Sequence, residues 1–153
     1  MSTFRMKILP AFFLCIALFL AVGCKKQPKP SHGEFKPDEI FELQNGGSAR
    51  LAGGGLKLTF TAVVEDSRCP KGLDCFQEGR IRITLAAISN EQVRVMEFSR
   101  QASQTGPVTR PFENFSIQWL EVSPYPEGDV KIRVEEYKLR LRVKKQEDGG
   151  SDS

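Results

Sequence analysis

Residues 56–85 read LKLTFTAVVEDSRCPKGLDCFQEGRIRITL, and this stretch decides the fold. On both sides of a polar loop, apolar residues recur at every second position, which is the period of a strand with one buried face. The residues expected to face the core are Leu56, Leu58, Phe60, Ala62 and Val64 in the first strand, and Ile81, Ile83, Leu85 and Ala87 in the second. We therefore expect two core strands joined by the loop between them.

The loop contains Cys69 and Cys75, the only cysteines after residue 24. In a secreted protein two such cysteines normally form a disulfide. Their spacing excludes a C-x-x-C redox motif, and no second cysteine pair or nearby histidine completes a zinc site. A loose calcium site is the alternative, although the nearby acidic residues do not follow the EF-hand pattern. Those residues are Glu65, Asp66, Asp74 and Glu78. We expect a disulfide, no metal and no cofactor.

The rest of the chain continues the pattern of short strands separated by turns. Alternating segments are expected within residues 39–44, 48–52, 79–89, 92–99, 112–122, 130–134 and 137–143. Three glycines at 53–55 predict a turn, because no Lys-Ser/Thr follows them as in a phosphate-binding loop. Residues 100–111 are expected to be a loop that crosses between two sheets, and Trp119 a core residue. About seven to nine short antiparallel strands at spacings near ten residues predict an all-β fold. We expect an immunoglobulin-like β-sandwich, with a small β-barrel as the alternative.

The N-terminal segment has the three zones of a secretory signal. Arg5 and Lys7 are basic, residues 8–22 are apolar apart from Pro10, and small residues precede Cys24. This order predicts a signal peptide over residues 1–23. The apolar run of about 15 residues is shorter than the roughly 20 that span a bilayer, so a membrane helix is the second interpretation.

The end of that segment, Ala21-Val22-Gly23-Cys24, resembles the lipobox of bacterial lipoproteins. The resemblance implies that Cys24 becomes the lipidated N-terminus and that the protein is held at a membrane, stably so with two or more acyl chains. An ordinary secretory signal with an unmodified Cys24 is the alternative. Lys25 favours the outer membrane, since an Asp there retains enteric lipoproteins at the inner membrane. Residues 24–38 are rich in Pro and Lys and predict an extended tether of up to ~40 Å. The folded domain is expected over residues 39–145, followed by a disordered tail, 146–153.

Several motifs in the body resemble a family of bacterial lipoproteins whose activity is uncharacterised. They are Glu65-Asp66-Ser67-Arg68-Cys69-Pro70, Cys75 with Gly79, Val122-Ser123-Pro124-Tyr125-Pro126, and Tyr137 with Leu139, Leu141 and Val143. Together these motifs cover most of residues 56–143. The chain departs from the family at Phe76 and Gln77, near the second cysteine, where the family has Trp. The resemblance implies a secreted all-β domain and leaves its molecular activity open.

The composition favours a binding or structural module over an enzyme. Without Arg5 and Lys7 the net charge of +3 falls to about +1, which does not predict a nucleic-acid partner. The expected domain contains no histidine, so carboxylates are the remaining acid–base groups for an alternative wall hydrolase. The stiff cysteine loop predicts a binding surface for an envelope protein or glycan, with protease inhibition as another alternative. Its candidate contacts are Arg68, Pro70, Lys71 and Gly72. No catalytic residue is expected.

Overall fold

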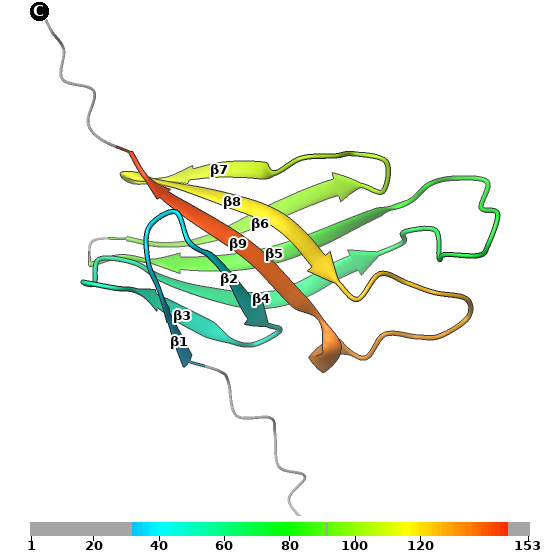
Figure 1. Ribbon diagram of the computed structural model, residues 1–153, viewed down its shortest axis with the longest axis horizontal. Coiled ribbons are helices and arrows are strands. Elements are labelled where there is room, and N and C mark those ends of the chain that lie inside the picture. The colour runs from blue at the N-terminus through cyan, green and yellow to red at the C-terminus, as the bar shows by residue number, and fades with distance from the viewer. Residues whose placement is uncertain (1–31, 91, 147–153) are drawn as a thin grey trace, which may run out of the picture.

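The computed structural model describes residues 32–90 and 92–146, which form nine β-strands and one short 3-10 helix (Figure 1). The strands make two facing sheets, and within the described residues these sheets do not close into a barrel. The predicted all-β sandwich is therefore confirmed. The predicted signal peptide, Cys24 and residues 147–153 of the predicted tail lie outside the described residues. Over the same ranges, no helix has the length and apolar character that crossing a membrane requires.

The first sheet has five strands in the order β1-β3-β4-β5-β6. Their bounds are β1 His32–Phe35, β3 Ser48–Leu51, β4 Lys57–Asp66, β5 Arg80–Ile88 and β6 Val93–Gln101. The second sheet has the order β2-β9-β8-β7. Its strands are β2 Ile40–Gln44, β9 Lys138–Lys145, β8 Phe115–Ser123 and β7 Val108–Phe112. Neighbouring strands pair antiparallel except β1 and β3, which run parallel, so the prediction of a wholly antiparallel fold is wrong for that pair.

The core lies between the two sheets and is built from the alternating apolar positions of the facing strands. On β5 the four predicted core residues are all buried: Ile81, Ile83, Leu85 and Ala87. Trp119 on β8 is fully buried, as predicted, and meets Phe98 of the opposite sheet edge to face at a ring-centroid distance of 6.3 Å. Burial of each large apolar side chain contributes about 1.5–3 kcal/mol, so this layer is the main source of stability.

Strand β4 departs from the simple alternation predicted for it. Register shifts occur between Phe60 and Ala62 and again between Val63 and Glu65. A single extra residue turns the following side chains to the other face of a sheet. Val63 consequently packs against the core, whereas Val64 is 48% exposed. The prediction that Ala62 and Val64 face the core is therefore wrong.

The domain begins earlier than the sequence pattern suggests. Residues His32–Phe35 form β1 and pair with β3, and the Phe35 side chain is buried and stacks on Phe41 with ring centroids 4.1 Å apart. The predicted tether over residues 24–38 therefore extends too far, and the start of the domain at residue 39 is too late. Since β1 begins at His32, the expectation of a domain without histidine is also wrong. Phe35 lies in a polar, Pro-rich segment whose composition does not predict burial, and its contact with the Phe41 ring is what places it in the core.

The chain crosses from the first sheet to the second between β6 and β7, as predicted for residues 100–111. Strand β7 nevertheless occupies Val108–Phe112, partly inside the segment predicted to be loop. Arg100 from β6 closes this side of the sandwich, because it donates hydrogen bonds to the carbonyl oxygens of Trp119 (2.9 Å) and Leu120 (2.8 Å). Its guanidinium also lies 4.4 Å from the Trp119 ring centroid.

The segment before β9 is not the strand that its alternation predicted. Residues 124–133 form a loop, and Val134–Glu136 form a single 3-10 turn named η1. Val130 and Val134 are exposed, while Ile132 packs at the margin of the core. The break in phase near Glu135 and Glu136 coincides with η1, after which β9 begins at Lys138.

Candidate functional site

Two loops lie together at one end of the sandwich, at the right of Figure 1. The first joins β4 to β5 and holds the cysteines, and the second spans residues 124–133. Lys71 of the first loop donates its backbone N–H to the Pro126 carbonyl at 2.9 Å, and its own carbonyl accepts from Gly128 N–H at 3.2 Å. These bonds make an isolated parallel bridge between Lys71 and Glu127. We call this pair of loops the loop end.

Cys69 and Cys75 form the predicted disulfide, with their Cα atoms 5.8 Å apart. The two sides of the loop are also joined below the disulfide. Ser67 N–H donates to the Arg80 carbonyl at 2.8 Å, and Cys69 N–H donates to the Glu78 carbonyl at 3.0 Å. The strand pairing of β4 with β5 thus continues into the loop up to the cysteine that closes it.

Gly79 allows the two sides of the loop to approach this closely. Its φ is +69°, and a Cβ atom placed on it would lie 1.7 Å from the Ser67 carbonyl oxygen. No side chain fits at that distance, so the base of the loop requires glycine. Four residues after Cys75, Gly79 is also one of the positions that carries the family resemblance.

Arg68 is not a surface contact, and its prediction as a binding residue is wrong. Its guanidinium is buried and donates to both carboxylate oxygens of Asp66, from Nε at 2.7 Å and from Nη2 at 2.6 Å. It also donates to the carbonyl oxygens of Val122 (3.2 Å) and Pro124 (3.0 Å) at the end of β8. A buried guanidinium with these four acceptors ties the first sheet to the second, which is a structural role.

Tyr137 completes the same cluster from the start of β9. Its hydroxyl donates to Oδ2 of Asp66 at 3.0 Å. Burial, together with the hydrogen bond that the phenol donates to the negatively charged Asp66 carboxylate, raises the pKa of Tyr137 from 10.0 to about 12. The Asp66, Arg68 and Tyr137 side chains therefore form one polar connection between the sheets, which we call the inter-sheet cluster.

Tyr125 connects the inter-sheet cluster to the surface of the loop end. Arg68 lies 4.7 Å from its ring centroid and Lys71 lies 5.7 Å from it. Cation–π contacts of this kind contribute about 0.5–2 kcal/mol each, more when the cation is desolvated as Arg68 is. The motifs that carry the family resemblance, Glu65–Pro70, Val122–Pro126 and Tyr137, therefore meet at one place in the fold.

The remaining predicted loop residues lie nearer the surface. Pro70 is half-buried, whereas Lys71 and Gly72 are exposed, and Gly72 has a φ of +82°. The most exposed apolar residues of the loop end escaped prediction: Phe76 is 101% exposed, Leu73 46% and Val130 76%. For Leu73 and Phe76 the only signal in the sequence was their position inside a polar loop, whereas Val130 was expected in a strand over residues 130–134.

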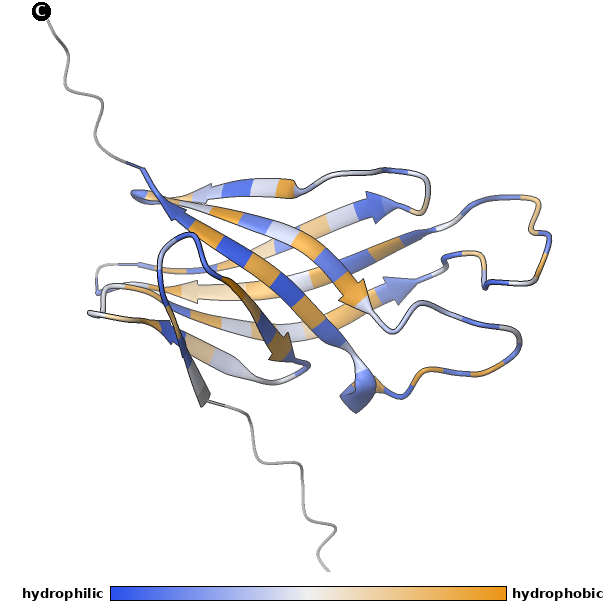
Figure 2. Ribbon diagram, in the orientation of Figure 1, coloured by the Kyte–Doolittle hydropathy of each residue, from blue (hydrophilic) through white to orange (hydrophobic). Residues whose placement is uncertain are grey.

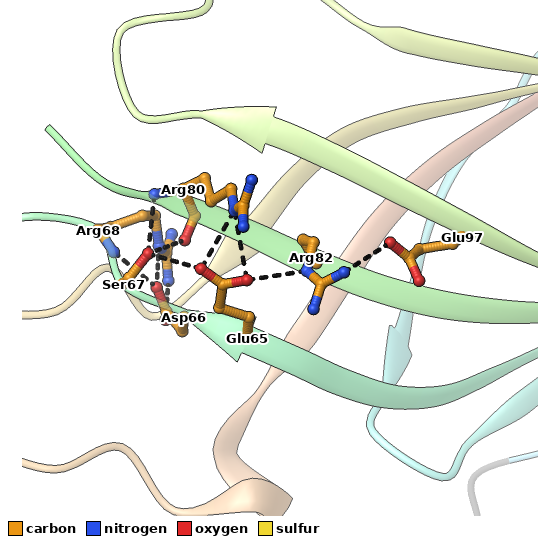
Figure 3. Close-up of polar contacts among 7 residues, drawn as sticks. All are labelled: Glu65, Asp66, Ser67, Arg68, Arg80, Arg82 and Glu97. Carbon is orange, nitrogen blue, oxygen red and sulfur yellow. Dashed lines mark hydrogen bonds and ion pairs between the residues drawn. The ribbon is translucent and has the colours of Figure 1, made fainter.

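A polar ladder runs from the base of the cysteine loop across the outer face of the first sheet (Figure 3). Glu65 accepts from Arg80 at 3.1 Å and from Arg82 at 2.8 Å, and Arg82 reaches Glu97 at 3.1 Å. Hydrogen bonds from Arg80 and Ser67 lower the pKa of the Glu65 carboxyl below 4.5. Beside this ladder lies a shallow hollow of about 510 Å³, lined by Glu65, Ser67, Gln77, Glu78, Gly79, Arg80 and Gln101.

The charge state of Glu65 and the spacing of the potential metal ligands describe the chemistry available at this end of the fold. A Glu65 carboxyl whose pKa is lowered is ionised at neutral pH, the opposite of what a general acid requires. Across residues 32–90 and 92–146, no three His, Cys, Asp or Glu side chains come together in a way that could hold a metal ion. Cys24, the predicted lipidation site, lies outside these ranges.

Comparison with known proteins adds no family assignment: no family model, no curated protein and no solved structure matches the chain. The resemblance to bacterial lipoproteins therefore stays a prediction from the motifs.

Proposed function

We propose that the protein is a lipid-anchored component of the bacterial cell envelope, held at the outer membrane through Cys24, and that its β-sandwich is a non-catalytic binding module. The partner is an envelope protein or glycan that contacts the loop end. The observation that carries this proposal is a contrast within one loop. Its base is fixed by the disulfide and the inter-sheet cluster, yet its tip presents Phe76 and Leu73 to solvent.

The physical reason is that a partner gains most from side chains that are already held in place. A flexible loop loses conformational entropy when it binds a partner, which weakens binding. A loop that is already fixed at its base in the free protein loses less entropy on binding. Aromatic side chains in such positions often supply a large part of the binding energy. Phe76 is fully exposed in the free protein, so its ring is available to an external contact.

The two alternative activities have less support. A protease inhibitor presents a loop whose backbone is free to pair with the enzyme, but both backbone groups of Lys71 already bond to residues 126 and 128. A carboxylate hydrolase needs one carboxyl with a raised pKa beside an ionised one, whereas the pKa of Glu65 is lowered.

The binding part is tested by placing a photo-crosslinking amino acid at position 76 of the whole chain in its native envelope. We expect a discrete adduct from position 76, lost when Leu73→Ser and Val130→Ser are added. The matched control carries the crosslinker at position 95, since Val95 is also an exposed apolar residue but lies on β6. No adduct from position 76, or the same adducts from both positions, would overturn the proposal for the loop end.

The anchor is tested separately by metabolic labelling with an alkyne analogue of palmitate. We expect the intact chain to take up the label and Cys24→Ser to lose it. Cys15→Ser is the matched control, because Cys15 lies inside the predicted signal peptide and should not affect the label. Persistence of the label in Cys24→Ser would remove the anchor from the proposal.

A further inference from the structure

Strand β9 carries four basic residues on the outer face of the second sheet. Its inward residues Leu139, Leu141 and Val143 are buried, and the alternating outward residues are Lys138, Arg140, Arg142 and Lys144. The alternation is visible as successive blue and orange bands along β9 in Figure 2. At about 3.4 Å per residue the four cations span roughly 20 Å in a straight line. We call this row the β9 stripe.

Only half of the β9 stripe is neutralised by the protein itself. Lys138 pairs with Glu42 at 3.3 Å, and Arg140 pairs with Glu121 at 2.8 Å. Arg142 and Lys144 form no ion pair with any residue in the ranges 32–90 and 92–146. Their cross-strand neighbours are uncharged: Arg142 lies opposite Ile40 and Gln118, and Lys144 lies opposite Ser116. The outer face of β2, β9 and β8 therefore keeps a positive charge.

The loop end does not share this positive charge. Residues 67–79 and 124–133, the two loops of the loop end, include four acidic and four basic side chains. The acidic residues are Asp74, Glu78, Glu127 and Asp129, and the basic residues are Arg68, Lys71, Lys131 and Arg133. A negatively charged surface would thus attract the β9 stripe more strongly than the loop end.

We propose that the outer face of the second sheet, through the β9 stripe, binds the anionic headgroups of a lipid bilayer. This inference deepens and rests on the proposed function, because it would lay the second sheet of an anchored domain against the lipid surface. A membrane is the partner that fits best, since the cations form a straight row on an open sheet face rather than lining a pocket. Lysine and arginine near an anionic bilayer each add a similar increment of attraction, which falls off over a Debye length of about 8 Å in physiological salt.

The test uses the chain from residue 24 to 153 with Cys24→Ser, so that no acyl chain contributes to binding. Its partition is measured by co-sedimentation with vesicles of phosphatidylcholine alone and of phosphatidylcholine with phosphatidylglycerol. We expect binding only when phosphatidylglycerol is present, with a loss of binding as salt is raised. Arg142→Gln with Lys144→Gln should lower the partition coefficient about 30-fold.

The matched control is Arg50→Gln with Lys57→Gln, which removes the same charge from a cross-strand pair on the first sheet. It should lower the partition coefficient by less than about threefold. Lys144→Glu alone, at an exposed position, should lower binding in the same direction as the double variant if Arg142→Gln disturbs folding. Equal losses from the two sheets, or no preference for phosphatidylglycerol, would overturn this inference. Because the acyl chain is absent, neither result depends on whether Cys24 is lipidated.

Discussion

Asp66 and Arg68 form a buried ion pair at the end of β4, with Oδ2 and Nη2 2.6 Å apart and side chains only 8% and 5% exposed. The carboxylate belongs to β4, and the guanidinium continues to the carbonyl oxygens at the end of β8. Removing one partner of a buried pair leaves a charge without a counter-charge, which costs far more than the pair contributes as a whole. The fold at the loop end therefore depends on both residues being present.

Arg68→Met should lower the free energy of unfolding by about 3–5 kcal/mol, because it strands the Asp66 carboxylate in a buried site. Urea denaturation at pH 7 measures this change. Arg68→Met with Asp66→Leu should recover part of the loss, since an apolar pair carries no desolvated charge. Arg133→Met removes an exposed arginine from its ion pairs and should leave the unfolding midpoint almost unchanged. Similar losses from Arg68→Met and Arg133→Met would contradict the structural role of Arg68.

Gly79→Ala should destabilise the protein by about 3 kcal/mol or more, since it combines left-handed backbone strain with a Cβ 1.7 Å from the Ser67 carbonyl oxygen. Gly72→Ala is the matched comparison, because Gly72 also has a positive φ but a Cβ atom added there would meet no atom within 4 Å. That variant should lose only about 1–2 kcal/mol. Thermal unfolding of the two variants distinguishes the close approach at Gly79 from the strain that both positions share.

Replacing Cys69 and Cys75 together by Ser should lower the free energy of unfolding by about 2.4 kcal/mol, the entropy of closing a seven-residue ring in the unfolded chain. The sandwich should remain folded, because Gly79 and the inter-sheet cluster still hold the base of the loop. Circular dichroism and urea denaturation measure the two effects. In the unmodified protein, neither cysteine should react with a thiol reagent under denaturing conditions without reductant, and reaction of both would count against the disulfide.

Ionisation of the Tyr137 phenol should lower the free energy of unfolding at high pH. Its pKa is raised in the folded state from 10.0 to about 12, so the folded protein holds this proton more tightly than the unfolded chain. The resulting stabilisation is fully present below pH 10 and is lost as pH rises toward 12. The stability difference between the unmodified protein and Tyr137→Phe should accordingly be constant below pH 10 and then shrink.

Urea denaturation of the unmodified protein and of Tyr137→Phe from pH 7 to 12 measures that difference. Lysine side chains titrate in the same way in both proteins, so their effect cancels when the two stabilities are subtracted. The Tyr125→Phe background leaves Tyr137 as the single phenol of the chain, so absorbance at 295 nm follows it directly. A Tyr137 titration centred at pH 10 would show that its bond to Asp66 is absent in solution.

The local pattern of residues 56–85 was enough to predict a strand, a disulfide-closed loop and a second strand. On β5 it also predicted each inward residue, because an uninterrupted strand alternates strictly. On β4 the same rule failed after Phe60, since two register shifts turn Ala62 and Val64 away from the core. A β-bulge depends on the pairing register between a strand and its neighbour, which cannot be predicted from the sequence of one strand alone.

The sequence by itself determined the period of the strands, their apolar faces and the cysteine pair, because each of these depends on residues close together in the chain. The tertiary structure decided that Phe35 joins the core, that Arg68 is buried and that Phe76 is exposed. The partners of Arg68 at Val122 and Pro124 lie 54 and 56 residues away, and Tyr137 lies 71 residues from Asp66. Whether a charged side chain is a surface contact or a buried connection depends on such distant partners, and only the packing of the two sheets brings them together.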